Sequence, residues 1–118
     1  MQAILMIHSD ETAWARLPEA EVGRLMAAYG AYAEALVAAG VMRGGERLHD
    51  AATAKRVRVG PAGAEVLDGP YAETREQLGG YFLIEVPDMQ AAVEWAARCP
   101  GAAHGTIEVR PIWQTPKA

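Results

Sequence analysis

The order of apolar patterns along the chain constrains its fold more than any other feature of the sequence. Short apolar runs predict strands at residues 3–8, 41–48, 81–86 and 106–112, and helical spacing of apolar residues predicts helices at 19–39 and 88–99. Between the two halves, the alternating stretches 55–59 and 64–67 predict a β-hairpin. The resulting order is β-α-β, hairpin, β-α-β. It predicts an α+β fold of the ferredoxin-like split βαβ type with a β-hairpin insert.

The ends of both predicted helices carry their own signals. Pro18 suits the first turn of a helix, and Glu19 and Glu21 suit the positive end of its dipole. Gly40 has the position of a glycine that ends a helix. Asp88, directly before the second apolar stripe, is predicted to be an N-cap.

Length and composition limit the classes of protein to which the chain can belong. Its 118 residues fit one ordinary domain, which we place at residues 1–118, and a hydrophobic content of 51% excludes a disordered chain. The net charge of −4 comes without a dense Lys/Arg cluster, so we expect no nucleic-acid partner. No apolar run approaches the roughly 18–20 residues of a membrane helix, and the N-terminal run predicts a first strand rather than a signal peptide. With Cys99 as its single cysteine, the chain is predicted to be cytoplasmic, without a disulfide and without a membrane partner.

Alternation along the strands predicts two different faces of the sheet. Three sets are purely apolar and suit the side covered by helices: Ala3, Leu5 and Ile7; Phe82, Ile84 and Val86; Ile107 and Val109. The opposite side would carry Ile4, Met6, Tyr81, Leu83 and Ile112, which is too apolar to face water. We therefore expect a homodimer that pairs sheet against sheet as a dimeric α+β barrel. Its interior would be a cavity for a small molecule, lined by His8, Glu85, Glu108 and Arg110.

The segment 68–77 is unusually rich in polar side chains for a connection that leads into a strand. Asp68-Gly69-Pro70 has two interpretations: a turn, or a general acid or base at a pocket mouth that works with His8. Residues 72–77 fit a single helical turn, on which Glu73 and Glu76 would form either a solvated acidic face or a carboxylate pair. We expect Tyr71, Glu73 and Thr74 to lie on the rim of the cavity and to contact its ligand.

The histidines and the single cysteine offer few further sites. His8 is interpreted either as a base that faces the ligand or as a structural residue at a strand end, whereas His49 and His104 are expected at the surface. Glu108 and Arg110 share a strand face and are expected to form an ion pair or to bind an anion. The spacing of these residues fits neither a zinc site nor a phosphate loop, so we expect no metal and no cofactor.

The stretch DGPYAETREQLGGYFLIEV, residues 68–86, resembles the signature of the DGPF branch of the YCII-related family. Other segments agree with it: Ala39-Gly40-Val41, Gly44-Gly45-Glu46, EWAAR at residues 94–98 and EVRP at residues 108–111. The resemblance covers nearly the whole chain and implies a dimeric α+β barrel.

The resemblance also bears on function. It implies a His–Asp pair with the histidine on the first helix, but residues 19–39 contain no histidine. Carried over to this sequence, the aspartate is Asp68, and His8 is the substitute for its partner. Related branches include a dehydrochlorinase of chlorinated hydroxyquinols, and DGPF proteins are often encoded near extracytoplasmic-function sigma factors.

Three functional hypotheses follow. The first is a small-molecule-binding dimer that performs acid/base catalysis with Asp68 and His8. The second is a non-catalytic regulatory or partner-binding module linked to extracytoplasmic-function sigma factor signalling, with a protein partner that the sequence does not identify. The third is a structural dimer whose barrel is filled by its own side chains.

Overall fold

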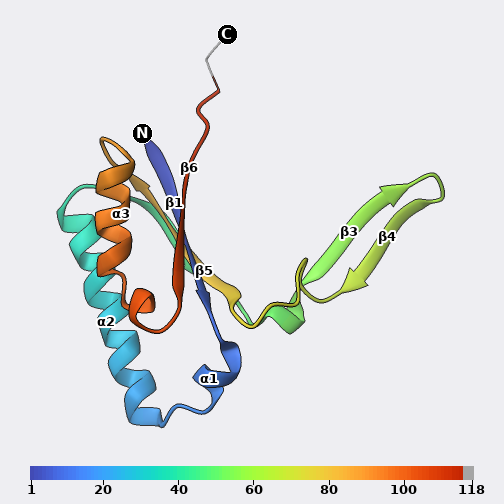
Figure 1. Ribbon diagram of the computed structural model, residues 1–118, viewed down its shortest axis with the longest axis horizontal. Helices are drawn as coiled ribbons and strands as arrows, with labels where there is room; N and C mark the ends of the chain where they lie inside the picture. The colour runs from blue at the N-terminus through green and yellow to red at the C-terminus, as the bar shows by residue number, and fades with distance from the viewer. Residues whose placement is uncertain (116–118) are drawn as a thin grey trace.

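Four antiparallel strands form the main sheet in the order β2-β5-β1-β6 (Figure 1). A computed structural model describes residues 1–115 of the chain. Its strands are β1 (Gln2–Ser9), β2 (Met42–Arg47), β3 (Lys55–Gly60), β4 (Gly63–Asp68), β5 (Gln77–Glu85) and β6 (Thr106–Pro111). Its helices are α1 (Glu11–Ala15), α2 (Glu19–Ala38) and α3 (Met89–Arg98), with the short 3₁₀ helices η1 (Ala51–Thr53) and η2 (Pro100–Ala103). Without the separate β3–β4 pair, this is the ferredoxin-like plan that the sequence predicts.

Both long helices, α2 and α3, cover one face of the sheet (Figure 1). The core lies between these two helices on one side and the sheet on the other. It consists of Ala3, Leu5, Ile7, Tyr32, Leu36, Ile84, Val86, Ala92, Ala96 and Cys99, with Phe82, Ile107 and Val109 packed against it. The predicted division of the strands into two faces is therefore confirmed. We call the opposite side, with the half-buried residues Ile4, Met6, Tyr81, Leu83 and Ile112, the open face.

The helix ends follow the predicted signals. Asp88 caps α3, since its side chain accepts a hydrogen bond of 2.9 Å from the N–H of Ala91. Pro18 directly precedes α2. Gly40 follows the C-cap of the same helix with a φ of 73°, a left-handed conformation that glycine adopts without strain.

The predicted hairpin forms a separate two-stranded sheet that projects from the body (Figure 1). We call β3, β4 and their turn, residues 55–68, the arm. At its base the N–H of Gly69 donates a hydrogen bond of 2.8 Å to the carbonyl of Ala54, so the two ends of the arm are held together. Gly69 has a φ of 97°, which explains a glycine at this turn.

Two local predictions need correction. β5 begins at Gln77, four residues before the predicted start at Tyr81, because Gly79 and Gly80 carry no side chains that would show a strand pattern. Residues 72–77 do not form a helical turn. The side chain of Gln77 instead donates to the carbonyls of Ala72 and Thr74, which holds the segment as a series of bends. None of the helices within residues 1–115 has the length and apolar character that crossing a membrane requires.

Candidate functional site

A cleft of about 430 Å³ opens between α1, α2 and the end of the sheet at which β5 begins. Its apolar lining consists of Ile7, Trp14, Met26, Tyr29, Leu48 and Phe82. Its polar lining comes mainly from α1 and from the end of β2 and the residues after it: Ser9, Glu11, Glu46, Arg47, His49 and Asp50. Clefts of this size, mostly apolar and with a few polar groups, are the usual form of a small-molecule site.

Two glycines allow the adjacent ends of β2 and β5 to come close together beneath the cleft. A Cβ at Gly45 would lie 2.8 Å from Cδ1 of Phe82. A Cβ at Gly80 would lie 2.9 Å from the carbonyl oxygen of Glu46. Because both contacts are shorter than real Cβ atoms make, a side chain at either position would push the strands apart.

A β-bulge shapes the same end of the sheet. Ile7 of β1 faces Gly80 of β5. The next residue, His8, faces Leu78, which leaves Gly79 as the extra residue of the bulge. The carbonyl of this extra residue accepts a hydrogen bond of 2.8 Å from the N–H of the first residue after β2. The bulge therefore fixes the start of the segment that carries His49 and Asp50.

Arg47 joins the two helices that border the cleft. Its guanidinium lies 5.2 Å from the centroid of the Trp14 ring on α1, and its Nη1 lies 3.4 Å from Sδ of Met26 on α2. Glu11 fixes the opposite end of the polar segment, because its Oε1 accepts a hydrogen bond of 2.8 Å from the N–H of Ala51. Both side chains thus have a structural role as well as a place in the lining.

Asp10 places α1, and with it Trp14, at the edge of the cleft. Its Oδ1 accepts hydrogen bonds from the hydroxyl (2.6 Å) and the N–H (2.9 Å) of Thr12, as an N-cap residue does. The hydrogen bond from the Thr12 hydroxyl is the main cause that holds the pKa of Asp10 below its usual value. A weaker contact of 3.4 Å comes from Nε of Arg75.

Tyr29 is the deepest ionisable group of the lining. Burial raises its pKa to about 12, and the neighbouring Cys99 thiol adds to the shift. Its hydroxyl lies against Gly101 and the Cys99 thiol. Burial also raises the pKa of Cys99, which disfavours the thiolate that a nucleophilic role requires.

Two polar side chains of the lining are free to contact a ligand. Within residues 1–115, the side chains of His49 and Asp50 make no hydrogen bond to the rest of the chain. They are exposed and adjacent in sequence, just after the bulge-anchored end of β2, whereas Glu46 faces Tyr81 in the register of β2 and β5 and directs its side chain to the open face. In the part of the chain that the structure describes, no group of three or more His, Cys, Asp or Glu side chains could hold a metal ion.

The predicted catalytic residue His8 lies on the open face, on the other side of the sheet from the cleft. Its Nε2 is 3.0 Å from Oε1 of Glu108, a residue of the neighbouring strand β6. Within residues 1–115 Glu108 thus pairs with His8, and the predicted ion pair of Glu108 with Arg110 inside the dimer stays a prediction. The structure gives His8 a carboxylate partner, but this partner is Glu108.

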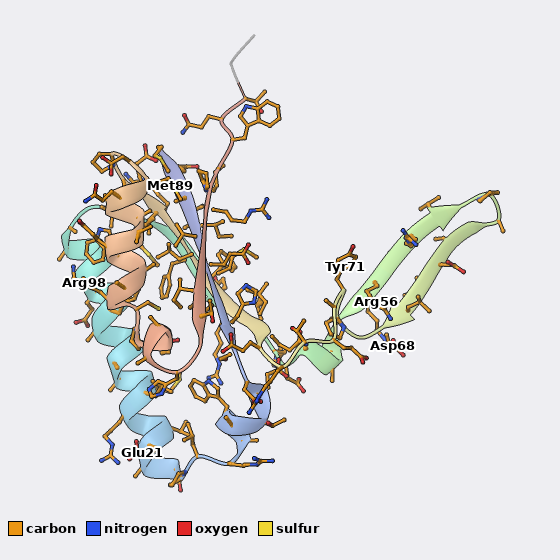
Figure 2. All side chains as sticks on the ribbon, viewed as in Figure 1. Glu21, Arg56, Asp68, Tyr71, Met89 and Arg98 are labelled. Carbon is orange, nitrogen blue, oxygen red and sulfur yellow. The ribbon has the colours of Figure 1, made fainter. Side chains whose placement is uncertain are left out.

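Asp68 lies elsewhere, at the base of the arm (Figure 2). It ends β4, its side chain is 81% exposed, and it pairs with Lys55 of β3 across the arm. The following glycine has the left-handed backbone described above. These contacts agree with the interpretation of Asp68-Gly69-Pro70 as a turn, and within the chain Asp68 makes no contact with His8.

The remaining predicted site residues do not line the cleft either. Tyr71 is 95% exposed, and Glu73 is also exposed. The hydroxyl of Thr74 donates to the carbonyl of Glu76 at 2.6 Å. On the open face, Oε1 of Glu85 lies 3.8 Å from the N-terminal amine. A shared cavity for these side chains on the open face needs a second copy of the chain, and so it stays a prediction.

Sequence reasoning missed the cleft because its residues come from four separate segments. Trp14 and Tyr29 each belong to the apolar pattern of a different helix. Such a pattern does not show whether an aromatic side chain lines a cleft or packs in a core. His49 was expected at the surface. It is exposed, but it also borders the cleft. The available signal was the polar run Glu46–Asp50 across the end of the predicted strand 41–48, interrupted only by Leu48.

Comparison with known proteins places the chain in a family. The model of the YCII-related domain matches residues 1–116. The chain belongs to the YCII-related family. A family relative, an uncharacterised protein of Rhizobium meliloti (strain 1021), is 31% identical over 110 residues, which cover 92% of this chain and 89% of the relative.

The predicted resemblance implied a catalytic histidine on the first long helix, which is α2 in the structure. In this chain α2 presents Met26 and Tyr29 to the cleft instead. The histidine and the aspartate that reach the same cleft are His49 and Asp50, from the segment after β2.

Proposed function

We propose that this YCII-related protein binds a small, partly aromatic molecule in the cleft between α1, α2 and the sheet. The observation that carries the proposal is the combination of a volume of about 430 Å³ with an aromatic lining and free polar groups. Trp14, Tyr29 and Phe82 provide surfaces for a ring or an alkyl group.

The polar groups define what the ligand would carry. Asp50 suits a hydroxyl or amine at the rim. For catalysis we propose His49 as the group that transfers a proton, since histidine is the most frequent general acid or base.

A second candidate site lies on the open face. The contact of 3.0 Å between His8 and Glu108 favours it, because a carboxylate partner orients an imidazole for proton transfer. In this proposal two copies pair sheet to sheet, and the resulting barrel encloses the His8–Glu108 pair together with Glu85 and Arg110. Asp68 is 81% exposed at the base of the arm and pairs with Lys55. In this proposal Glu108, and not Asp68, is therefore the carboxylate partner of His8.

A binding screen tests the first proposal. The probes are a library of small phenols, aromatic acids and aromatic amines, and the readout is the ¹H–¹⁵N NMR spectrum of the full chain. We expect shifts at the Trp14 indole and at residues 46–50. Binding should be lost in Trp14→Ala but retained in Trp113→Ala, because Trp113 is 89% exposed and outside the cleft.

Histidine variants separate the two sites. Once a probe or a substrate is found, His49→Ala should lose binding or turnover if the cleft is the site, whereas His8→Ala should lose it if the open face is the site. His104→Ala is the matched control, since His104 is exposed and lines neither site. Shifts confined to the open face would overturn the proposal for the cleft.

A further inference from the structure

The arm exposes an apolar surface that no other part of residues 1–115 covers. In its register Val57 faces Val66 and Val59 faces Ala64, and residues that face each other across a strand pair lie on the same side. The other side carries Arg56, Arg58, Glu65 and Leu67. Val57, Val59 and Val66 are 61%, 81% and 60% exposed. Lys55 and Asp68 lie on the same side as the valines but at the base of the arm, where they pair with each other. Beyond this ion pair, the side is apolar and in contact with solvent.

A two-stranded hairpin of this kind is marginally stable in water unless its apolar side packs against something. The arm does not pair with the main sheet, and its ends are joined at its base by the Gly69–Ala54 hydrogen bond. An isolated β-ribbon with three exposed valines is also a site for unwanted association. The sequence of the arm is therefore better suited to an interface than to solvent.

The direction of the arm indicates what covers it. The arm leaves the body near the start of β5 and extends away from α2 and α3, toward the side of the open face (Figure 1). Tyr71, 95% exposed, points into the angle between the arm and the sheet (Figure 2). An aromatic side chain presented in this way is typical of an interface anchor. A body that occupied this angle would contact the open face, Tyr71 and the arm together.

We propose that this body is a second copy of the chain and that the two copies clasp each other with their arms. The inference rests on the sheet-to-sheet dimer proposed above and adds the arms to it. A two-fold axis would place the arm of each copy against the other copy, so that every exposed apolar surface is used twice. The valine side of each arm would then pack on its partner, with Tyr71 at the junction.

Length and charge both favour this occupant. A six-residue strand spans roughly 20 Å, which is enough to reach across a four-stranded sheet of roughly 15–19 Å. The arm contains three basic and two acidic residues, whereas the chain as a whole has a net charge of −4. All of the net negative charge therefore lies outside the arm, so an arm with its positive charge is attracted to the body of a second copy.

Sedimentation equilibrium of the full chain tests the clasp. We expect a dimer in which the double substitution Val59→Ser and Val66→Ser weakens association at least about tenfold, since each buried valine contributes roughly this factor. Val37→Ser is the matched control: Val37 is 64% exposed on α2, on the helical side of the sheet, and its loss should leave association unchanged. Circular dichroism and the NMR spectrum of the body confirm that each variant is folded.

The outcomes separate the clasp from the dimer on which it rests. If the chain is a dimer that Leu83→Glu on the open face disrupts, but the valine variant associates as tightly as the unmodified chain, the clasp is wrong and the sheet-to-sheet dimer stands. A chain that stays monomeric up to millimolar concentration overturns both. As a second measurement, hydrogen exchange of the amides in β3 and β4 should slow as the concentration rises through the dissociation constant. Exchange rates independent of concentration would count against the clasp.

Discussion

Removal of a single hydroxyl at the centre of the core should show how α3 is attached to the rest of the fold. Tyr32 of α2 is 5% exposed, and its hydroxyl donates a hydrogen bond of 2.6 Å to the carbonyl of Trp95. Trp95 lies in the last turn of α3, where carbonyls have no partner within the helix. Tyr32→Phe therefore leaves a buried acceptor without its donor, while it keeps the ring and its edge-on contact with Phe82 at 5.3 Å.

The expected loss follows from two contributions. The hydrogen bond itself contributes about 1 kcal/mol, and the carbonyl left without a partner costs about 1–2 kcal/mol, so we expect the free energy of unfolding to fall by about 2 kcal/mol. For a chain of this length the melting temperature should fall by roughly 6–10 °C. Tyr32→Ala, which also removes the ring, should cost about 3–5 kcal/mol.

Urea unfolding followed by tryptophan fluorescence measures these differences. Tyr81→Phe is the control, because Tyr81 lies on the open face and its hydroxyl makes no hydrogen bond within residues 1–115. It should change the free energy of unfolding by less than about 0.5 kcal/mol. A Tyr32→Phe variant as stable as the Tyr81→Phe variant would refute the view that the hydroxyl of Tyr32 holds the end of α3.

Three further predictions concern local features. Burial raises the pKa of Tyr29 from 10.0 to about 12, so the folded state holds its proton more tightly. Its contribution to stability should be complete below pH 10 and should fall by about 1–2 kcal/mol as the pH rises through about 12, less than the full shift implies because the side chain is only half buried and solvent screens it. Urea unfolding of Tyr29→Phe over this pH range should show a smaller dependence on pH. Asp88→Ala should lower the free energy of unfolding by about 1 kcal/mol because α3 loses its N-cap, whereas Asp88→Asn should retain most of it in the same assay. Gly45→Ala should lower the melting temperature by the equivalent of about 1–3 kcal/mol, since its Cβ would meet Phe82, while Gly44→Ala, whose Cβ would have 3.8 Å to its nearest neighbour, should change it less. Equal melting temperatures for the two alanine variants would contradict the close approach of β2 and β5.

The fold could be predicted from the sequence because alternating residues along each strand show which side of the strand is buried. In β1 the alternation of Ala3, Leu5 and Ile7 with their neighbours identifies the buried side, and the structure buries these three residues. The start of β5 was missed since Gly79 and Gly80 give no periodic signal. A bulge also inserts its extra residue there, which changes the phase of the alternation.

The candidate site was harder to predict because proximity in space depends on register and not on residue type. The sequence placed His8 and Glu108 on one face, but only the pairing of β1 with β6 brings them within 3.0 Å of each other. The cleft depends on contacts between α1, α2 and the end of β2, which no local pattern encodes. Asp68 was chosen as a catalytic residue from its surroundings in sequence, and in the structure the same surroundings form a turn.

The hydrogen bond between Gly69 and Ala54 has a consequence for how such chains diversify. Because the chain leaves the body and returns to it at one point, an arm of another length or composition can be grafted between residues 54 and 69 without altering the pairing of β2 with β5. Recombination at these two residues would transfer the arm between relatives as a unit. Under the proposed clasp, choice of partner and integrity of the fold would be encoded in separate stretches of sequence, and each could change while the other is kept.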